Sequence, residues 1–208
     1  MKQLRPSVFT PKITGATVHI PAGPSIPLMV VTLVTTRNPY DAAGELYCLQ
    51  ALRQHPKLLR GERLRLRCRR YCENVDGFAA RLVLAAGVSA CDALLGVPTR
   101  RGRLQRPYLA AARAIRPGIV DLTKLVRRVG DAGSESKLSF AERQARHELT
   151  GPLPVVRRLL ILDDFLASGE SATHVIELIR RHTSPTPEFV LAVPLWVPRE
   201  DQAANFIR

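Results

Sequence analysis

The sequence contains few cysteines, few aromatic residues and no long hydrophobic run. Its longest apolar run, around Leu28 to Val34, is far shorter than the roughly 20 residues that a membrane helix requires. The four cysteines form neither a disulfide framework nor a complete zinc-ligand set. They are Cys48, Cys68, Cys72 and Cys91. We therefore expect a cytoplasmic protein with structural thiols and no membrane association.

Acidic residues are also scarce compared with basic ones. The chain has 31 lysines and arginines against 18 aspartates and glutamates, a formal net charge of +13. Such an excess attracts polyanions, including nucleic acids, polyphosphates and acidic proteins. An arginine-rich composition without any polyanionic partner gives the same balance, so the charge alone leaves both interpretations open.

The 208 residues are 46% hydrophobic, which predicts one globular domain with a sizeable core. An N-terminal β extension over 1–40 contains a hairpin of strands at 17–20 and 28–34. Strands are predicted at 92–98, 119–122, 158–162 and 188–193, and helices at 41–59, 76–86, 104–115 and 171–181. This alternation predicts an α/β fold, a Rossmann-like parallel sheet with helices on both faces. Residues 123–148 lack a clean apolar period and are predicted to be a mobile loop with a helical patch after Ser139.

The most informative segment is 159–172, where four apolar residues run into Asp163 and Asp164. A loop of small residues follows, and then the helical pattern of 171–181 begins. Ligands of open α/β sheets bind outside the carboxyl ends of the strands, and a helix N-terminus offers N–H groups to an anion. The alternative is an ordinary buried strand with both aspartates in a turn and Ser168 as a helix cap.

This segment resembles the phosphoribosyl-pyrophosphate (PRPP) motif of type I phosphoribosyltransferases. That motif consists of apolar residues, two acids, an apolar residue and a loop of Thr or Ser around a glycine. Here the acids are Asp163 and Asp164 and the loop is 167–171. Ala167 stands where the family often has a hydroxyl residue, and Glu170 adds a negative side chain to the loop.

The resemblance implies the type I phosphoribosyltransferase fold and a role for each matching residue. Ser168, Gly169, Glu170 and Ser171 would hold the 5-phosphate of PRPP, the substrate. Asp163 and Asp164 would hold the ribose hydroxyls and place Mg²⁺, directly or through water or the ribose. The reaction implied is transfer or cleavage at ribose C1 with release of pyrophosphate. The acceptor stays open, as does assembly into a homodimer or a complex with other proteins.

A second segment, 97–106, resembles the loop after a central strand in the competence-associated branch of phosphoribosyltransferase-like proteins. A Val-Pro step leads there into an arginine-rich loop, which contacts pyrophosphate in the wider fold. The resemblance implies that Arg100, Arg101 and Arg103 bind pyrophosphate, since guanidinium pairs with phosphate in a bidentate manner. The segment 123–148 would close over the ligand, and Trp196 is either a stacking surface for the acceptor or a core residue.

An alternative function follows from the basic stretch 60–70, in which arginine alternates with leucine or cysteine. As a strand it would present Arg63, Arg65, Arg67 and Arg69 on one face, with Arg70 beside them; as a helix it would spread them around the axis. The helix would be mostly a solvated surface, whereas the strand, together with Ala167 and Glu170 in the phosphate loop, favours a catalytically reduced PRPP-fold module that binds DNA or RNA. DNA uptake and bacterial antiviral systems such as retrons are contexts that the resemblance suggests for it.

Overall fold

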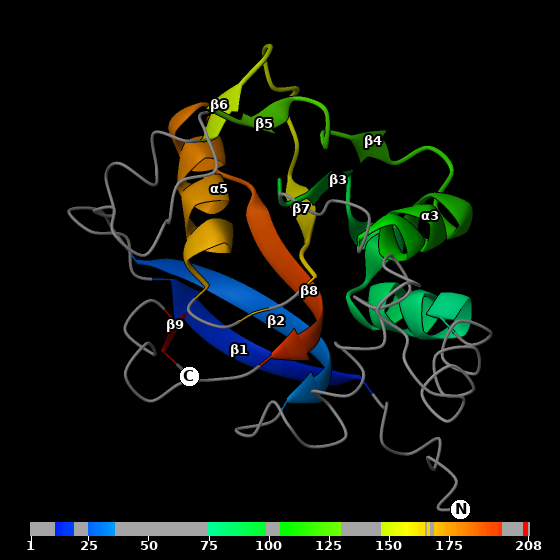
Figure 1. Ribbon diagram of the computed structural model, residues 1–208. Helices are drawn as coiled ribbons and strands as arrows, with labels where there is room; N and C mark the ends of the chain where they lie inside the picture. Colours follow the sequence, from blue (N-terminus) through cyan, green and yellow to red (C-terminus); the bar gives the residue numbers. More distant parts are fainter. Residues whose placement is uncertain are drawn as a thin grey trace, which may run out of the picture.

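A computed structural model shows how the predicted elements are arranged (Figure 1). It describes residues 11–18, 25–35, 75–98, 105–129, 147–164, 166, 169–196 and 206–207. The predicted helix 41–59, the arginines of 60–70 and the loop 99–104 therefore lie outside the described residues. No helix of the described part is long and apolar enough to cross a membrane.

A seven-stranded sheet organises the fold, in the order β4-β3-β7-β8-β2-β1-β9. The strands are β4 (Val120–Asp121), β3 (Ala93–Gly96), β7 (Arg158–Leu162), β8 (Glu188–Trp196), β2 (Ile26–Thr35), β1 (Lys12–Val18) and β9 (Phe206–Ile207). The neighbours from β4 to β2 run parallel, whereas β1 pairs antiparallel with both β2 and β9. The predicted Rossmann-like parallel sheet is confirmed.

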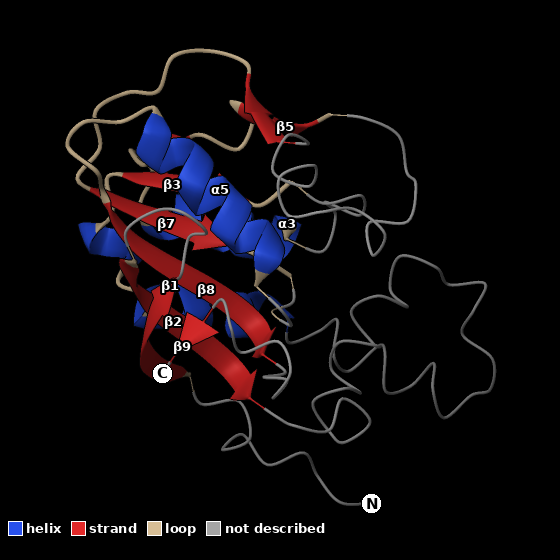
Figure 2. Cartoon of the chain, turned by 90° about the vertical axis from the view of Figure 1, so that its left-hand side faces the viewer, coloured by secondary structure: helices blue, strands red, loops and turns tan. Residues whose placement is uncertain are grey.

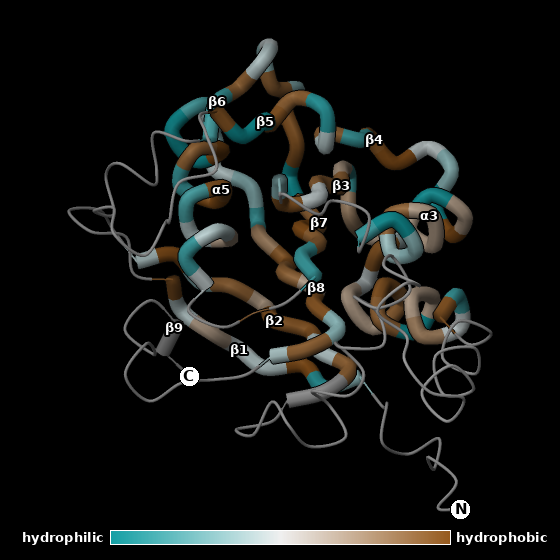
Figure 3. Tube along the Cα trace, in the orientation of Figure 1, coloured by the Kyte–Doolittle hydropathy of each residue, from teal (hydrophilic) through white to brown (hydrophobic). Residues whose placement is uncertain are grey.

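Helices cover both faces of this sheet (Figure 2). Leu159 and Ile161 of β7 pack on the same side as α5 (Glu170–Arg181). Leu160 and Leu162 belong to the other core, with α3 (Arg106–Ile115) and the helical residues 75–85. A central parallel strand buries both faces, so its sequence is continuously apolar rather than alternating. The strands at the centre of the sheet are accordingly coloured mostly brown, as hydrophobic, in Figure 3.

The N-terminal hairpin is present, with different bounds from those predicted. Strand β1 begins at Lys12 and ends at Val18, ahead of the predicted 17–20, and β2 extends from Ile26 to Thr35. The β1 residues 12–15 are mostly exposed, so they lack the apolar signal that marks a buried strand. Because β2 lies beside β8, the hairpin extends the main sheet.

The ends of the predicted loop 123–148 are ordered strands, which the sequence analysis does not anticipate. Strands β5 (Val126–Arg128) and β6 (His147–Leu149) form a two-stranded antiparallel sheet, with Val126 opposite Leu149. Arg127 and Glu148 form an ion pair across it. Strands of three residues are too short to show a period in the sequence. Residues 130–146, including the predicted helical patch, lie outside the described part.

The remaining predicted elements agree closely with the structure. Residues 75–85 are helical and Gly87 adopts φ 67°, the left-handed conformation that suits a helix end. A short 3-10 helix, η3 (Val88–Ala90), leads into β3. Strand β8 continues beyond the predicted 188–193 to Trp196, which is 3% exposed within the core. Trp196 therefore takes the core role rather than that of an exposed stacking surface.

Candidate functional site

The direction of the strand order reverses between β3 and β7. From β3 the chain passes through α3 to β4 on one side, and from β7 it passes through α5 to β8 on the other. These two connections diverge, so the gap outside the carboxyl ends of β3 and β7 is the switch point at which α/β sheets bind ligands. The backbone is fixed up to this edge, because Val97 N–H donates to Leu162 O at 2.8 Å and Asp163 N–H to Ala192 O at 3.2 Å.

Asp163 lies at this edge and is 5% exposed. Its Oδ1 accepts the backbone N–H of Asp164 at 2.8 Å and Nε2 of Gln105 at 3.4 Å. Burial raises the pKa of Asp163 well above its usual value, and the adjacent negative charge of Asp164 raises it further. The Asp164 N–H and Gln105 oppose this rise without cancelling it. A cation bound here would offset the repulsion between the two carboxylates.

The segment after the aspartates returns to the sheet before α5 begins. Leu166 is 1% exposed, and its N–H donates to Leu195 O at 2.9 Å. Gly169 then takes φ 74° and ψ 2°, a left-handed conformation that a side chain would strain. Phe165, Ala167 and Ser168 lie outside the described residues.

Helix α5 begins one residue earlier than predicted. Gly169 is its N-cap, and no side chain of the described residues caps it, so Ser171, predicted at the junction of loop and helix, lies inside the first turn. Glu170 is likewise the first helical residue, where a negative charge favours the helix dipole. The first-turn N–H groups of an α-helix have no acceptor within the helix. The predicted binding of an anion by this segment depends on these N–H groups.

The structure thus brings Asp163, Asp164, Gly169, Glu170 and Ser171 to one edge of the sheet. Several other predicted site residues are not described, so their roles stay predictions. They are Ser168, Arg100, Arg101, Arg103, Arg63, Arg65, Arg67, Arg69 and Arg70.

Gln105 is the main residue at this edge that the sequence analysis missed. Its Nε2 donates to Val97 O at 2.7 Å as well as to Asp163, so one buried amide connects the ends of β3 and β7. Its side chain packs over Gly96. A glycine directly before the Val-Pro step was the available signal, since a glycine in a strand indicates a close approach by another group.

Two histidines lie beside this site. His147 opens β6, and its ring centroid is 6.1 Å from that of His174 on α5. Burial lowers the pKa of His147, and the positive charge of Arg128 lowers it further, while the Pro98 backbone acts in the opposite direction. The neutral ring is therefore favoured, and His147 of β6 lies close to both α5 and Pro98, two residues after the end of β3.

The donor set at the edge fits Mg²⁺. Among the described residues, no group of three or more His, Cys, Asp and Glu could hold a metal ion alone. Mg²⁺ commonly binds through one or two carboxylates together with substrate phosphates and water. Asp163 and Asp164 supply that pair, and the remaining ligands would come from a phosphorylated substrate.

Comparison with solved structures finds several similar chains. The chain is similar to orotate phosphoribosyltransferase from Aeropyrum pernix, with 16% sequence identity, coverage of 69% of this chain and 80% of that chain, and a TM-score of 0.36. No protein-family model and no curated protein matches the sequence. A likeness at this level carries no argument about this chain, whose fold is established by its own strand order and pairing.

Proposed function

We propose that this protein is a phosphoribosyltransferase-type enzyme that binds PRPP or a related ribose phosphate with Mg²⁺ at the edge between β3 and β7. The observation that carries the proposal is the Asp163–Asp164 pair at the end of β7, at the switch point of the sheet. The N-terminus of α5 follows within the same connection. Carboxylates and an anion-binding helix end are what a ribose phosphate with a bound cation requires.

Each group has a defined task in this proposal. The first-turn N–H groups of α5 bind the 5-phosphate, together with the Ser171 hydroxyl. Asp163 and Asp164 hold the ribose hydroxyls and the Mg²⁺, which when bound neutralises the charge of the pyrophosphate. Arg100, Arg101 and Arg103 belong to the loop after β3 and bind the same pyrophosphate, in keeping with the resemblance of 97–106 to the competence-associated branch.

The reaction breaks the bond between ribose C1 and the pyrophosphate oxygen. The electron pair leaves with pyrophosphate, and the acceptor then forms the new bond to C1. The chain contributes by binding, by stabilising developing charge and by excluding water rather than by forming a covalent intermediate. The pairing of β5 with β6 beside α5 places the base of the segment 130–146 near this edge.

Calorimetry with PRPP and Mg²⁺ tests the proposal. The wild type should bind saturably, and the double variant Asp163→Asn/Asp164→Asn should lose binding. Glu177→Gln, on the same helix but remote from its N-terminus, is the matched control and should bind as the wild type does. The absence of binding by the wild type would reject the proposed function.

Binding of nucleic acid is a second candidate, favoured by the net charge of +13. Affinity for duplex DNA should then fall linearly on a log–log plot against salt, with a slope of about −0.9 for each phosphate contact. Replacing Arg63, Arg65 and Arg67 by Gln should make the slope shallower. A flat salt response in the wild type would remove this candidate.

A further inference from the structure

Gln105 is a polar residue in an unusually buried place. It is 3% exposed and is the N-cap of α3. Its backbone carbonyl begins the helix by accepting the N–H groups of Tyr108 and Leu109, each at 3.0 Å. Its side chain makes no capping hydrogen bond. A buried amide usually satisfies its hydrogen-bonding groups, so the side-chain contacts of Gln105 show what it does.

Those contacts connect the residues that directly follow β3 and β7. Nε2 donates to Val97 O at 2.7 Å, a short bond to the residue after β3. The same Nε2 lies 3.4 Å from Asp163 Oδ1, just after β7. The strong bond to a fixed backbone carbonyl holds the amide in place, and the second N–H is thereby directed at the carboxylate.

Gly96 makes this arrangement possible. A Cβ atom at Gly96 would lie 2.7 Å from Gln105 Oε1 and 3.4 Å from a methyl group of each of two neighbours, Leu109 and Thr123. The Gly96 N–H is itself bound to Thr123 Oγ1 at 3.0 Å, so the backbone is restrained on this side. The absence of a side chain at position 96 is therefore what leaves room for the amide.

The Asp163 carboxylate receives both donors on one oxygen. The Asp164 N–H and Gln105 Nε2 both point to Oδ1, so the rotation of the carboxylate about its own side chain is restricted. Hydrogen bonds to a charged acceptor stabilise its orientation more than those between neutral groups. A side-chain hydrogen bond with Asp164 restrains the Asp163 carboxyl group further.

We propose that Gln105 is a positioning residue, which holds Oδ1 of Asp163 in place so that the Asp163 carboxyl group meets the ribose hydroxyls and cation of the ligand in a fixed orientation. This inference rests on the proposed function for its ligand. Gln105 itself does not touch the ligand. It acts through Asp163, and its placement depends on the absence of a side chain at Gly96.

Two variants test the proposal by different routes. Gln105→Met keeps the side-chain length and removes the amide donor. Gly96→Ala keeps Gln105 and displaces its amide by steric contact. Glu177→Gln is the control, because it removes polar contacts of α5 away from this edge. All three are made in the full chain, and their free energies of unfolding are compared first.

Amide hydrogen exchange provides a readout that needs no ligand. The Asp164 amide is bound to the Asp163 carboxylate, whereas the Asp163 amide is bound within the sheet and reports general opening. In Gln105→Met and Gly96→Ala, exchange at Asp164 should accelerate relative to Asp163. In Glu177→Gln the ratio of the two rates should stay as in the wild type. An unchanged ratio in both site variants overturns the proposal whatever the wild type binds.

Binding provides the second readout. Loss of one hydrogen bond to a charged group should weaken the affinity for PRPP with Mg²⁺ by about tenfold in Gln105→Met. The affinity for inorganic phosphate, which needs only the N-terminus of α5, should not change. Equal weakening of both ligands would mean that Gln105 is merely structural and would overturn the proposal. If the wild type bound no PRPP while exchange at Asp164 responded, the proposed function would fail and the orienting contact would stand.

Discussion

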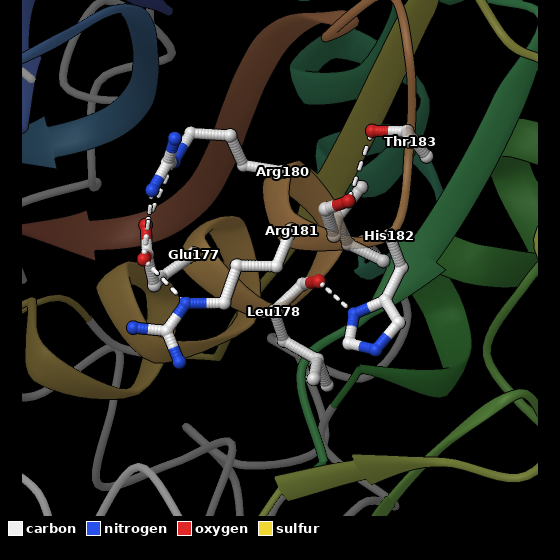
Figure 4. Close-up of polar contacts among 7 residues, drawn as sticks. Glu177, Leu178, Arg180, Arg181, His182 and Thr183 are labelled. Carbon is white, nitrogen blue, oxygen red and sulfur yellow. Dashed lines mark hydrogen bonds and ion pairs between the residues drawn. The ribbon is translucent and has the colours of Figure 1, made fainter. Parts of the chain in front are cut away.

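Two carboxylates on either side of the N-terminus of α5 are both buried, yet their surroundings are opposite. Asp163 is 5% exposed and receives a backbone N–H, one amide and the repulsion of Asp164. Glu177 is 1% exposed and lies under two guanidinium groups. Figure 4 shows Arg180 and Arg181 turning back over it. The pKa of Asp163 is raised, whereas that of Glu177 is lowered, because the hydrogen bonds from Arg180 and Arg181 outweigh the effect of burial.

The different surroundings mean that Glu177 stabilises the fold, whereas Asp163 lowers its stability. A buried carboxylate with two arginine partners is compensated within its own helix. A buried carboxylate next to a second acid is not, and such uncompensated groups gather at functional sites. The comparison therefore supports the assignment of Asp163 to binding and of Glu177 to the fold.

Asp163→Asn should have the largest effect among the tests of this contrast between the two carboxylates. Removing a charge that contacts both ribose and cation should weaken PRPP and Mg²⁺ binding by about a hundredfold. The same change should leave the free energy of unfolding equal to or above that of the wild type at neutral pH, since it removes a buried charge. Calorimetry and urea denaturation measure the two effects. A large loss of stability together with unchanged binding would reverse the assignment.

Glu177→Ala should give the opposite pair of results. It leaves Arg180 and Arg181 without their shared acceptor and should lower the free energy of unfolding by about 1–2 kcal/mol. PRPP binding should stay at the wild-type level. Denaturation curves and calorimetry on the same preparation test this, and reduced affinity at unchanged stability would contradict it.

The pH dependence should also differ in sign, measured without Mg²⁺. The raised pKa of Asp163 means that its contribution is present below its ordinary pKa of 3.8 and is lost as pH rises through the folded value. The advantage of Asp163→Asn over the wild type should therefore grow with pH. The lowered pKa of Glu177 gives a contribution that is present above the ordinary 4.5 and is lost as pH falls through the folded value. The deficit of Glu177→Gln should shrink in acid. If the unfolding free energies of both variants, relative to the wild type, changed with pH in the same direction, the surroundings of Asp163 and Glu177 would not be opposite.

The sequence predicts the secondary-structure elements around Asp163 far better than it predicts the contacts between them. Strand β7 and helix α5 have strong periods, and two adjacent acids after an apolar run mark the end of a central strand. The position of Asp163 at the carboxyl end of a buried parallel strand could therefore be predicted, and the strand order adds that this end lies at the switch point. Both a core and a stacking role were open for Trp196, because the predicted strand ended at 193 whereas β8 extends to Trp196.

The contacts of the site could not be predicted in this way. Gln105 meets Asp163 across 58 positions of sequence, and no local pattern encodes which way its side chain turns. The start of α5 could not be predicted to the residue, because it depends on Gly169 adopting a left-handed conformation at the N-cap position. The burial of Glu177 could not be predicted either. Its spacing to Arg180 and Arg181 is visible in the sequence, but its burial depends on tertiary packing.

The smallest expected effects separate the two arginines that cover Glu177. Arg180 donates from Nε and Nη2 to both carboxylate oxygens, each at 2.9 Å, and its side chain is 25% exposed. Arg181 donates once, from Nε at 2.7 Å, and is 54% exposed. Arg180→Met should therefore cost about 1 kcal/mol of unfolding free energy and Arg181→Met about half of that, since solvent screens the more exposed pair. In the double variant Glu177 would share the condition of Asp163, so the pKa of Glu177 should rise, as carbon-13 NMR of its carboxyl can measure. If that pKa stayed low without either arginine, the contrast between the two carboxylates would have a cause other than their partners.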